Sequence, residues 1–415
     1  MDRSLSNLDV NSLSFGSIPR NTRNIVLGAG PLAAGLGFYE VALAVFLPLE
    51  GASATTVGIL FSTAAVSAVA FSMPFAILSD RHGRKRIMLV GSTIAALVIA
   101  VPGLTSNFLL LEISAILGGL GEAMYLATWN AYLADTTTLD VRAATFSLSF
   151  MNFTIAMGIG SFLPAFFPLV NMDLLTAHRI TFVVLGAFSL ATSVSVQRWA
   201  VNTKPKSSRD GILPRKSLGI ITKFSLANML IGLGAGLIIP LIPTWFLFSF
   251  NETDVFSGPL IAASSFIMGA TAIAAPTVAK RIGLVKGIVV TQAMSTIFLL
   301  AVPFSPSPYI AASLYVVRAV LMNMASPLSD TFIMNMISED ERATASSFNV
   351  ILWRLPNAAS TSVGGSMLNS GHLQHSTFLL NLPFYLCTVL YVTAIVLFYT
   401  IFRKTEQRNS ETGAP

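Results

Sequence analysis

The chain has 415 residues, of which 53% are hydrophobic and only 11% are charged, whereas an ordinary soluble domain carries about a quarter charged residues. The apolar residues form blocks of about twenty or more, the length of helix that crosses a bilayer core, instead of the stripes of amphipathic helices or strands. The composition excludes a soluble globule, and the formal net charge of +6 has to be interpreted through topology before a nucleic-acid partner is considered.

Charges, glycine and proline turns and segment lengths divide the chain into twelve predicted transmembrane helices, between a polar N-terminal tail (1–23) and a polar C-terminal tail (403–415). The first six helices are expected at 24–49, 55–79, 87–105, 107–134, 143–170 and 179–201. The last six are expected at 218–249, 255–279, 284–304, 308–337, 343–370 and 375–402. The predicted fold class is therefore an all-α integral membrane protein, because these runs are too long and too evenly apolar for the strands of a membrane barrel.

A basic segment at 202–217, NTKPKSSRDGILPRKS, is the one central linker, and it separates two predicted six-helix bundles, 24–201 and 218–402. The two halves resemble each other at an offset of 200 residues. DVRAATFS at 140–147 aligns with DERATASS at 340–347, and SDRHG at 79–83 aligns with AKRIG at 279–283. Repeated bundles joined in this way favour a transporter whose site forms between two halves that rock.

The cations indicate which side of the membrane the loops occupy. Placing both tails, the linker and the basic loops in the cytoplasm puts 22 of the 25 lysines and arginines there, the asymmetry that orients membrane proteins. Only Arg179 falls in an outer loop. We therefore expect a multi-pass protein of the cell membrane with both termini cytoplasmic and no nucleic-acid partner. The first 24 residues have no short apolar core of the signal-peptide type, so no cleavage is expected.

The stretch AILSDRHGRKRIML (76–89) interrupts the apolar sequence with one aspartate and a cluster of cations. Gly83 allows a tight turn between two helices because glycine tolerates a positive φ. Asp80 can accept hydrogen bonds from the free N–H groups at a helix N-terminus. The stretch is similar to the loop 2–3 signature of the major facilitator superfamily. The positions that match the signature are Asp80, Arg81, Gly83, Arg84 and Lys85, whereas Ala76 replaces the usual glycine.

This resemblance covers essentially the whole chain, and it implies a cytoplasmic gate. Asp80 is then expected to contact the start of helix 11, near Ala343, while Arg84 could pair with Asp135 and Arg142 could join them. The predicted gate residues are Asp80, Arg81, Gly83, Arg84, Asp135 and Arg142. The alternative for the cations of the loop is that they only fix the topology.

Five ionisable side chains fall inside the predicted helices, where a charge costs at least about 2.5–3.5 kcal/mol on insertion scales and is by default a functional candidate. These are Glu40, Glu122, Arg318, Asp330 and Arg354. Four of them lie on helices 1, 4 and 10, which by resemblance to the superfamily line the central cavity.

The two acids of the first half are candidates to load and release protons, because burial raises and a nearby cation lowers a carboxyl pKa. Arg318 and Arg354 cannot lose their charge, so we expect them to bind an anionic group of the substrate. Asp330 is a candidate partner for an arginine or a member of the gate. The alternatives are permanent ion pairs between helices and, for Glu40, a contact with the outer membrane interface.

Aromatic residues cluster on the same helices, and we expect Tyr39, Trp129 and Trp353 to line the substrate cavity, although such residues often serve only in packing or in the interfacial belt. Pro240 and Pro243 predict a kink in helix 7. His82, His178, His372 and His375 fall in loops or at helix ends, which argues against a buried histidine relay.

Several function classes lack their signatures. No P-loop pattern supports ATP-driven transport, and no metal-ligand cluster or nucleophile triad supports an enzyme. The single cysteine, Cys387, excludes an internal disulfide. We therefore expect no cofactor, and we expect a monomer whose partners are the lipid bilayer, protons and a small molecule.

Three functions remain open. The first is proton-coupled export of amphiphilic or lipophilic compounds, as in the drug/proton antiporters, although the Gly-Pro pair typical of their helix 5 is absent around Gly158, Gly160 and Pro164. The second is proton-coupled symport or uniport of a small organic anion, which the two arginines favour. The third is a receptor or scaffold that keeps the fold without transporting.

Overall fold

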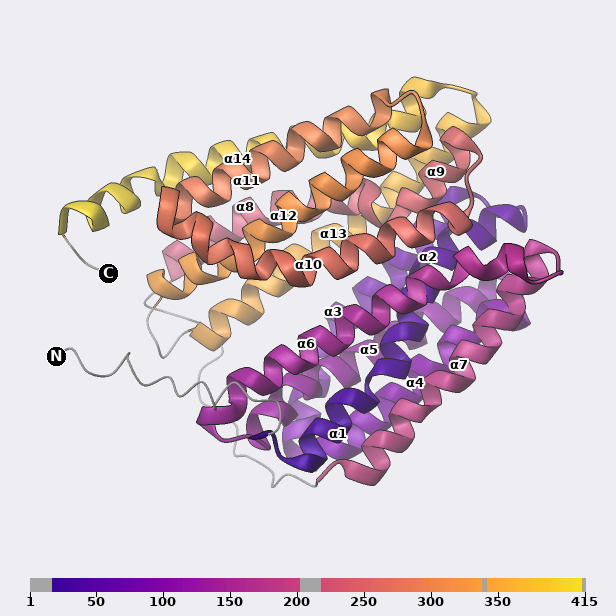
Figure 1. Ribbon diagram of the computed structural model, residues 1–415, viewed down its shortest axis with the longest axis horizontal. Helices are drawn as coiled ribbons and strands as arrows, with labels where there is room; N and C mark the ends of the chain where they lie inside the picture. Colours follow the sequence, from indigo (N-terminus) through magenta and orange to yellow (C-terminus); the bar gives the residue numbers. More distant parts are fainter. Residues whose placement is uncertain (1–16, 202–217, 338–341, 413–415) are drawn as a thin grey trace. The chain divides into compact units, whose positions relative to one another are not determined.

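A computed structural model describes residues 17–201, 218–337 and 342–412, and every regular element in these ranges is a helix (Figure 1). The predicted linker at 202–217 lies outside the described residues. So do residues 1–16 of the predicted N-terminal tail and residues 413–415 at the other end.

Each of the twelve predicted spans coincides with one helix or with consecutive helices. The first half contains α1 (Arg20–Gly28), α2 (Gly30–Leu49), α3 (Ala54–His82), α4 (Arg84–Leu104), α5 (Phe108–Asp135), α6 (Leu139–Phe162), the 3-10 helix η3 (Leu163–Leu169) and α7 (Leu174–Trp199). The second contains α8 (Leu218–Ile238), η4 (Ile239–Leu241), α9 (Ile242–Phe250), α10 (Asp254–Ile282), α11 (Leu284–Ala301), η5 (Val302–Phe304), α12 (Pro308–Met336), α13 (Arg342–Leu373) and α14 (Thr377–Thr412). The prolines predicted to disturb helix 7 lie where the α-helix is interrupted: Pro240 lies in η4, between α8 and α9, and Pro243 in the first turn of α9.

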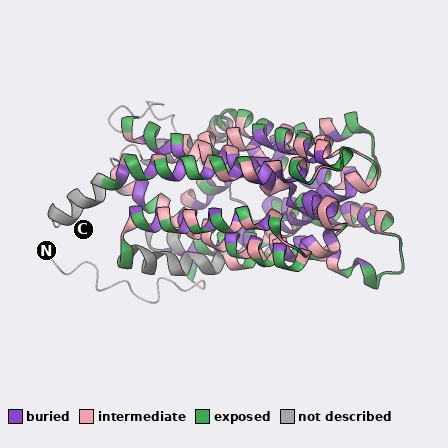
Figure 2. Ribbon diagram, turned by 90° about the horizontal axis from the view of Figure 1, so that it is seen from above, coloured by how far each residue is buried: buried purple, intermediate pink, exposed green. Residues whose placement is uncertain are grey.

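Ten segments of the described chain are long and apolar enough to cross a membrane, and α10 contributes a shorter apolar stretch at Asp254–Ile267. Large apolar side chains such as Leu97, Leu109 and Ile297 are more than half exposed. In Figure 2 exposed and buried positions alternate around the helices instead of separating into surface and interior helices. Exposed apolar faces of this extent, on helices long enough to cross a membrane, indicate a surface that contacts lipid.

The backbone repeats the 200-residue offset of the sequence. α3 spans Ala54–His82 and α10 spans Asp254–Ile282. Each is followed by a glycine with positive φ, 92° at Gly83 and 85° at Gly283, and this glycine precedes the next helix. Residues with positive φ also recur three residues before each of these helices begins, at Gly51 before α3 and at Asn251 before α10. The turns therefore follow one template in both halves, although the second copy of the loop lacks the aspartate.

Packing contacts group the residues into two compact units, which divide the chain differently from the predicted bundles. The first unit comprises 1–39, 67–163 and 172–209, and the second comprises 40–66, 164–171 and 210–415. The division passes through α2 and α3, so parts of these two helices pack with the second half of the chain.

In the first unit, α6 packs against α1 and α2 through glycine. A Cβ at Gly160 would collide with the carbonyl group of Ala34, and one at Gly37 would collide with the carbonyl group of Met157. Side-chain hydrogen bonds to backbone carbonyls accompany this contact: Asn152 Nδ2 donates to Val26 at 2.8 Å, and Ser161 Oγ donates to Gly37 at 3.0 Å. Small residues allow the backbones to meet, and polar side chains hold them there.

The second unit uses the same arrangement between α8 and α13. Cβ atoms at Gly236 and Gly364 would collide with the carbonyl groups of Asn357 and Leu237. Asn357 Nδ2 donates to the carbonyl oxygen of Gly232 at 3.2 Å. The repeat therefore extends from the turns to the contact that joins the first and fifth helices of each half.

Residues 40–66 are fixed within the second unit by three such contacts. Thr244 Oγ1 donates to the carbonyl oxygen of Ala44 at 2.6 Å, and Ser62 Oγ donates to that of Ala358 at 2.6 Å. A Cβ at Gly58 would lie 2.6 Å from the carbonyl oxygen of Thr361. Parts of α2 and α3 thus bond directly to the second half of the chain.

We expect Gly160→Ala to lower the free energy of unfolding by about 1–3 kcal/mol, the cost of overpacking a tight contact. The matched control is Gly219→Ala on α8, because Gly219 has no neighbouring atom within 4 Å of the added Cβ. Alanine should be neutral or stabilising there, since it favours a helix over glycine by up to about 1 kcal/mol. Thermal unfolding in detergent measures both. Equal midpoints for the two variants would contradict the close helix contact.

Candidate functional site

The loop between α3 and α4 positions Arg84 as the first residue of α4, directly after the left-handed Gly83. Its Nε lies 2.6 Å from Asp135 Oδ2 at the end of α5, and its NH2 group lies 3.3 Å from Asp80 Oδ1. The side chains of Arg84 and Asp135 are 9% and 13% exposed, whereas that of Asp80 is 46% exposed. The predicted pair of Arg84 with Asp135 is present, and it is the better shielded of the two ion pairs.

Arg142, on α6, binds backbone carbonyl groups at the same end of α5 as this ion pair. Its NH2 group donates to the carbonyl oxygens of Ala134 at 2.9 Å and Thr137 at 3.2 Å. These carbonyls belong to the end of α5, where a cation is favourable. Arg81 is exposed. The side chain of Ala343, at the helix start that Asp80 is expected to contact, lies outside the described part of the chain.

One face of α5 carries the predicted acid and two aromatic residues. Glu122, Tyr125 and Trp129 are spaced at i, i+3 and i+7, so they follow one stripe of the helix. The rings of Tyr125 and Trp129 stack with centroids 5.3 Å apart. Trp129 Nε1 donates to Ser149 Oγ on α6 at 2.9 Å. Glu122 is half-buried about 20 Å along the helix from Asp135.

The aromatic residues predicted to line a cavity have different surroundings. Trp129 is only 7% exposed, so its indole belongs to the packing between α5 and α6. Tyr39 is half-buried, with its ring edge-to-face against Phe182 of α7 at 6.1 Å. Trp353 is 37% exposed, although its backbone carbonyl lies against Gly232 of α8. Of the three, Trp353 leaves the largest part of its ring accessible.

The remaining predicted charges also differ in burial. Glu40 on α2 and Asp330 on α12 are exposed, and Arg354 on α13 is half-buried. Glu40 and Arg354 lie between aromatic or aliphatic residues, whereas Asp330 lies between Ser329 and Thr331. A charge that remains accessible along a membrane helix faces either a polar cavity or the interface.

Arg318 on α12 is buried, 6% exposed, and its surroundings are tyrosines. Its NH2 group donates to Tyr391 Oη at 2.9 Å. Its guanidinium carbon lies 5.9 Å from the ring centroids of both Tyr315 and Tyr391, within cation–π range. Within the described residues the Nε has no hydrogen-bond partner and no carboxylate pairs with this arginine.

The environment of Arg318 is shaped by α8 and α14. Gly234 of α8 leaves room for the ring of Tyr391, since a Cβ there would lie 2.9 Å from two of its ring carbons. The only cysteine, Cys387, is fully buried one turn before Tyr391 on α14. A cation with no anionic partner in an interior site costs several kcal/mol unless a ligand or π faces stabilise it. Arg318 is therefore stabilised within one helical unit by a tyrosine hydroxyl and two aromatic faces.

His178 is a residue whose burial the sequence analysis missed. It lies in the second turn of α7, is 0% exposed, and its Nδ1 lies 2.7 Å from the carbonyl oxygen of Leu174. Before it, Asp173 caps the helix, and hydrogen bonds from the backbone and side chain of Thr176 lower the pKa of its carboxyl. The i, i+4 spacing of His178 and the buried Phe182 was the available signal. Within the described residues no cluster of three or more potential metal ligands occurs.

Two repeated helical units, lipid-compatible faces and buried charges define an integral membrane transporter. A sequence profile described as "Major Facilitator Superfamily" matches the chain twice, over residues 25–225 and 224–414. The chain belongs to the major facilitator superfamily.

Curated relatives match part of the chain. Multidrug resistance protein 2 of Bacillus subtilis is 29% identical over 170 residues, which cover 39% of this chain and 42% of the relative. Quinolone resistance protein NorA of Staphylococcus aureus is 24% identical over 160 residues, which cover 38% of this chain and 39% of NorA. The chain thus matches about two fifths of the length of these relatives.

Solved structures match nearly the whole of this chain. A bacterial homolog of the human lysosomal transporter Spinster, in an inward-facing and occupied conformation, superposes with a TM-score of 0.74 at 16% identity, covering 93% of this chain and 98% of that chain. The nucleoside transporter NupG gives a TM-score of 0.71 at 13% identity, covering 92% of this chain and 99% of that chain. At these identities the likeness establishes the fold alone.

We expect Asp135→Asn to destabilise the protein by about 1.5–3 kcal/mol, the range for hydrogen bonds to charged groups, because it weakens the shielded contact of Arg84. Asp80→Asn should cost less than about 1 kcal/mol, because Asp80 is itself 46% exposed and its contact with Arg84 is longer. Thermal unfolding of both variants in the same detergent gives the comparison. A larger loss for Asp80→Asn would overturn this ranking.

Proposed function

We propose that this transporter exports amphiphilic or lipophilic compounds in exchange for protons, with Glu122 and Glu40 as the proton-carrying groups. The observation that carries the proposal is the half-buried carboxyl of Glu122 within α5, in line with the aromatic faces of Tyr125 and Trp129. Such a carboxyl can change its protonation as its surroundings change from wet to dry. Two partial relatives, a multidrug resistance protein and a quinolone resistance protein, support the same substrate class.

The gate of this transporter would be the network of Asp80, Arg81, Gly83, Arg84, Asp135 and Arg142. The ion pair of Arg84 with Asp135 joins α4 to α5, and the two carbonyl contacts of Arg142 join α6 to the same end of α5. The three helices would then move as one body. The contacts of residues 40–66 with 218–415, from Ser62 to Ala358 and from Thr244 to Ala44, would have to separate during alternating access.

The test is transport by protein reconstituted into liposomes, with dissipation of an imposed pH gradient measured against a panel that includes ethidium and tetraphenylphosphonium. Glu122→Gln should reduce the compound-dependent dissipation to the level of protein-free liposomes, because an amide cannot carry a proton. The control is Glu252→Gln. Glu252 lies in the turn before α10, which begins at Asp254, and this variant should transport like the parental protein.

Parental coupling in Glu122→Gln would remove this residue as a carrier. No response to any compound in the parental protein, in either orientation, would remove proton-coupled export itself.

A second candidate is transport of a small organic anion, which the tyrosine-lined Arg318 favours. Substrate contacts would then come from Arg318, Arg354 and Trp353, with Asp330 as a competing anion. Arg318 has hydrogen-bonding capacity left at Nε, and within the described residues no carboxylate neutralises it. Arginine presents a planar fork suited to carboxylates.

For this candidate, Arg318→Lys should keep some uptake of organic anions with a higher KM, because the charge remains and the fork is lost. Arg318→Gln should abolish the uptake. Counterflow of labelled benzoate and other small carboxylates in liposomes provides the readout, with Tyr315→Phe as the control that keeps the guanidinium and its hydrogen bond to Tyr391. Unchanged counterflow in Arg318→Gln, with a folded protein by thermal unfolding, would exclude this role.

A further inference from the structure

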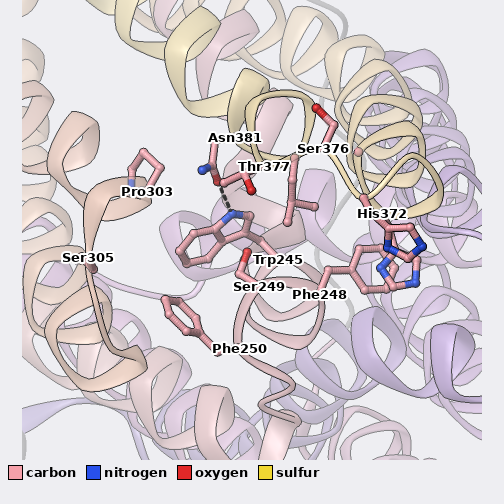
Figure 3. A pocket seen from close by; sticks show the side chains of 13 residues that line it. Trp245, Phe248, Ser249, Phe250, Pro303, Ser305, His372, Ser376, Thr377 and Asn381 are labelled. Atoms are coloured by element: carbon pink, nitrogen blue, oxygen red, sulfur yellow. Dashed lines mark hydrogen bonds between the residues drawn. The ribbon is translucent and has the colours of Figure 1, made fainter.

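A cavity of about 360 Å³ lies at the end of the second unit where α9 ends and α14 begins (Figure 3). Its walls come from the end of α9, the turn after η5, the turn between α13 and α14, and the first turns of α14. Every lining residue belongs to the segment 245–381, so the cavity is formed by one unit alone. No residue assigned above to proton coupling, substrate binding or gating lines it.

Aromatic rings form one side of the cavity, and they are held in place. Trp245 Nε1 donates to Asn381 Oδ1 at 2.9 Å, a bond drawn in Figure 3. The ring of Phe250 lies edge-on to the indole at 5.5 Å. The ring of Phe248 stacks on His372 with centroids 4.0 Å apart and 17° between planes. Trp245 is itself only 1% exposed, so the aromatic surface that a ligand can reach comes from the half-buried Phe248 and Phe250. Fixed aromatic surfaces of this kind favour planar, apolar ligand groups.

Hydroxyl groups and imidazoles make another part of the cavity wall polar. Ser249 Oγ is buried and, among the described residues, has no hydrogen-bond partner. A buried hydroxyl without a partner costs about 1–3 kcal/mol, which a bound acceptor would recover. His372 and His375 are exposed at the rim. His375 is held there in a left-handed conformation, φ 50°, by the tight turn after α13.

The charge of the lining selects among ligands. No aspartate, glutamate, lysine or arginine lines the cavity, so its ionisable groups are the two imidazoles. Imidazoles repel a cation when protonated and donate hydrogen bonds to an anion. The volume lies at the lower end of ligand sites, which hold about 300–1,000 Å³. A ligand of one or two fused rings fits this size.

We infer that this cavity binds a small planar aromatic carboxylate. The rings of Phe248 and Phe250 cover the aromatic plane, Ser249 donates to an oxygen of the ligand, and the two histidines face the carboxylate. The site goes beyond the transport function proposed above, because its residues belong to one unit and include none of the predicted transport residues.

Binding of three naphthalene probes to the full-length protein in nanodiscs tests the assignment by saturation-transfer NMR and equilibrium dialysis. The probes are 2-naphthoate, the uncharged 2-naphthylmethanol and the cationic 2-naphthylmethylammonium, each corrected for binding to empty nanodiscs. We expect 2-naphthoate to bind most tightly and the cation most weakly. Equal affinity of the three probes, or no binding of 2-naphthoate, would overturn the proposal.

Variants locate the probe. Ser249→Ala should weaken 2-naphthoate about fivefold to tenfold through loss of one hydrogen bond. Thr377→Trp should abolish binding, because the larger side chain fills the cavity. Thr377 is exposed, so this substitution should disturb folding little. Glu122→Gln should leave the affinity unchanged. Parental affinity in Thr377→Trp, or loss of binding in Glu122→Gln, would place the probe elsewhere and reject the cavity as its site.

Discussion

The structure depends on helices that meet backbone to backbone at glycine. Lipid tails offer no hydrophobic driving force between apolar helices, so close packing and hydrogen bonds have to hold them together. Gly37 and Gly160 provide that contact in the first unit, and Gly236 and Gly364 provide it in the second. An asparagine amide bonded to a neighbouring carbonyl accompanies each contact. Because these bonds use backbone acceptors, the apolar side chains around them can vary without moving the helices.

In the part of the chain that the structure describes, two arginines are buried, each in a different way. Arg84 has carboxylate partners at a helix junction, where opposite charges repay the loss of water. Arg318 has a tyrosine hydroxyl and two π faces, which solvate the cation without cancelling its charge. The first arrangement suits a permanent structural contact between helices. The second leaves a positive potential inside the second unit, and this difference is the reason for assigning gating to one arginine and anion binding to the other.

The sequence predicted positions along the helices well and directions around them poorly. Apolar blocks and turns located the helices along the chain, ten of which, among the described residues, are long and apolar enough to cross a membrane. The pairing of Arg84 with Asp135 followed from two helix ends on the same side. The rise per residue gives the depth of a residue in the membrane, but the neighbouring helix decides whether its side chain is buried or accessible. Trp129 was expected in a cavity and is packed against α6, while His178 was placed at a helix end and is fully buried. Neither outcome is visible without the neighbouring helix.

The fully buried position of Cys387 has a practical consequence. Membrane transporters are commonly studied by attaching spin or fluorescent probes to introduced thiols, which first requires removal of the native ones. Here the single native thiol is enclosed beside Tyr391 and out of reach of bulky maleimides. Pairs of engineered attachment points can therefore be read in the otherwise natural chain, with the surroundings of Arg318 left intact.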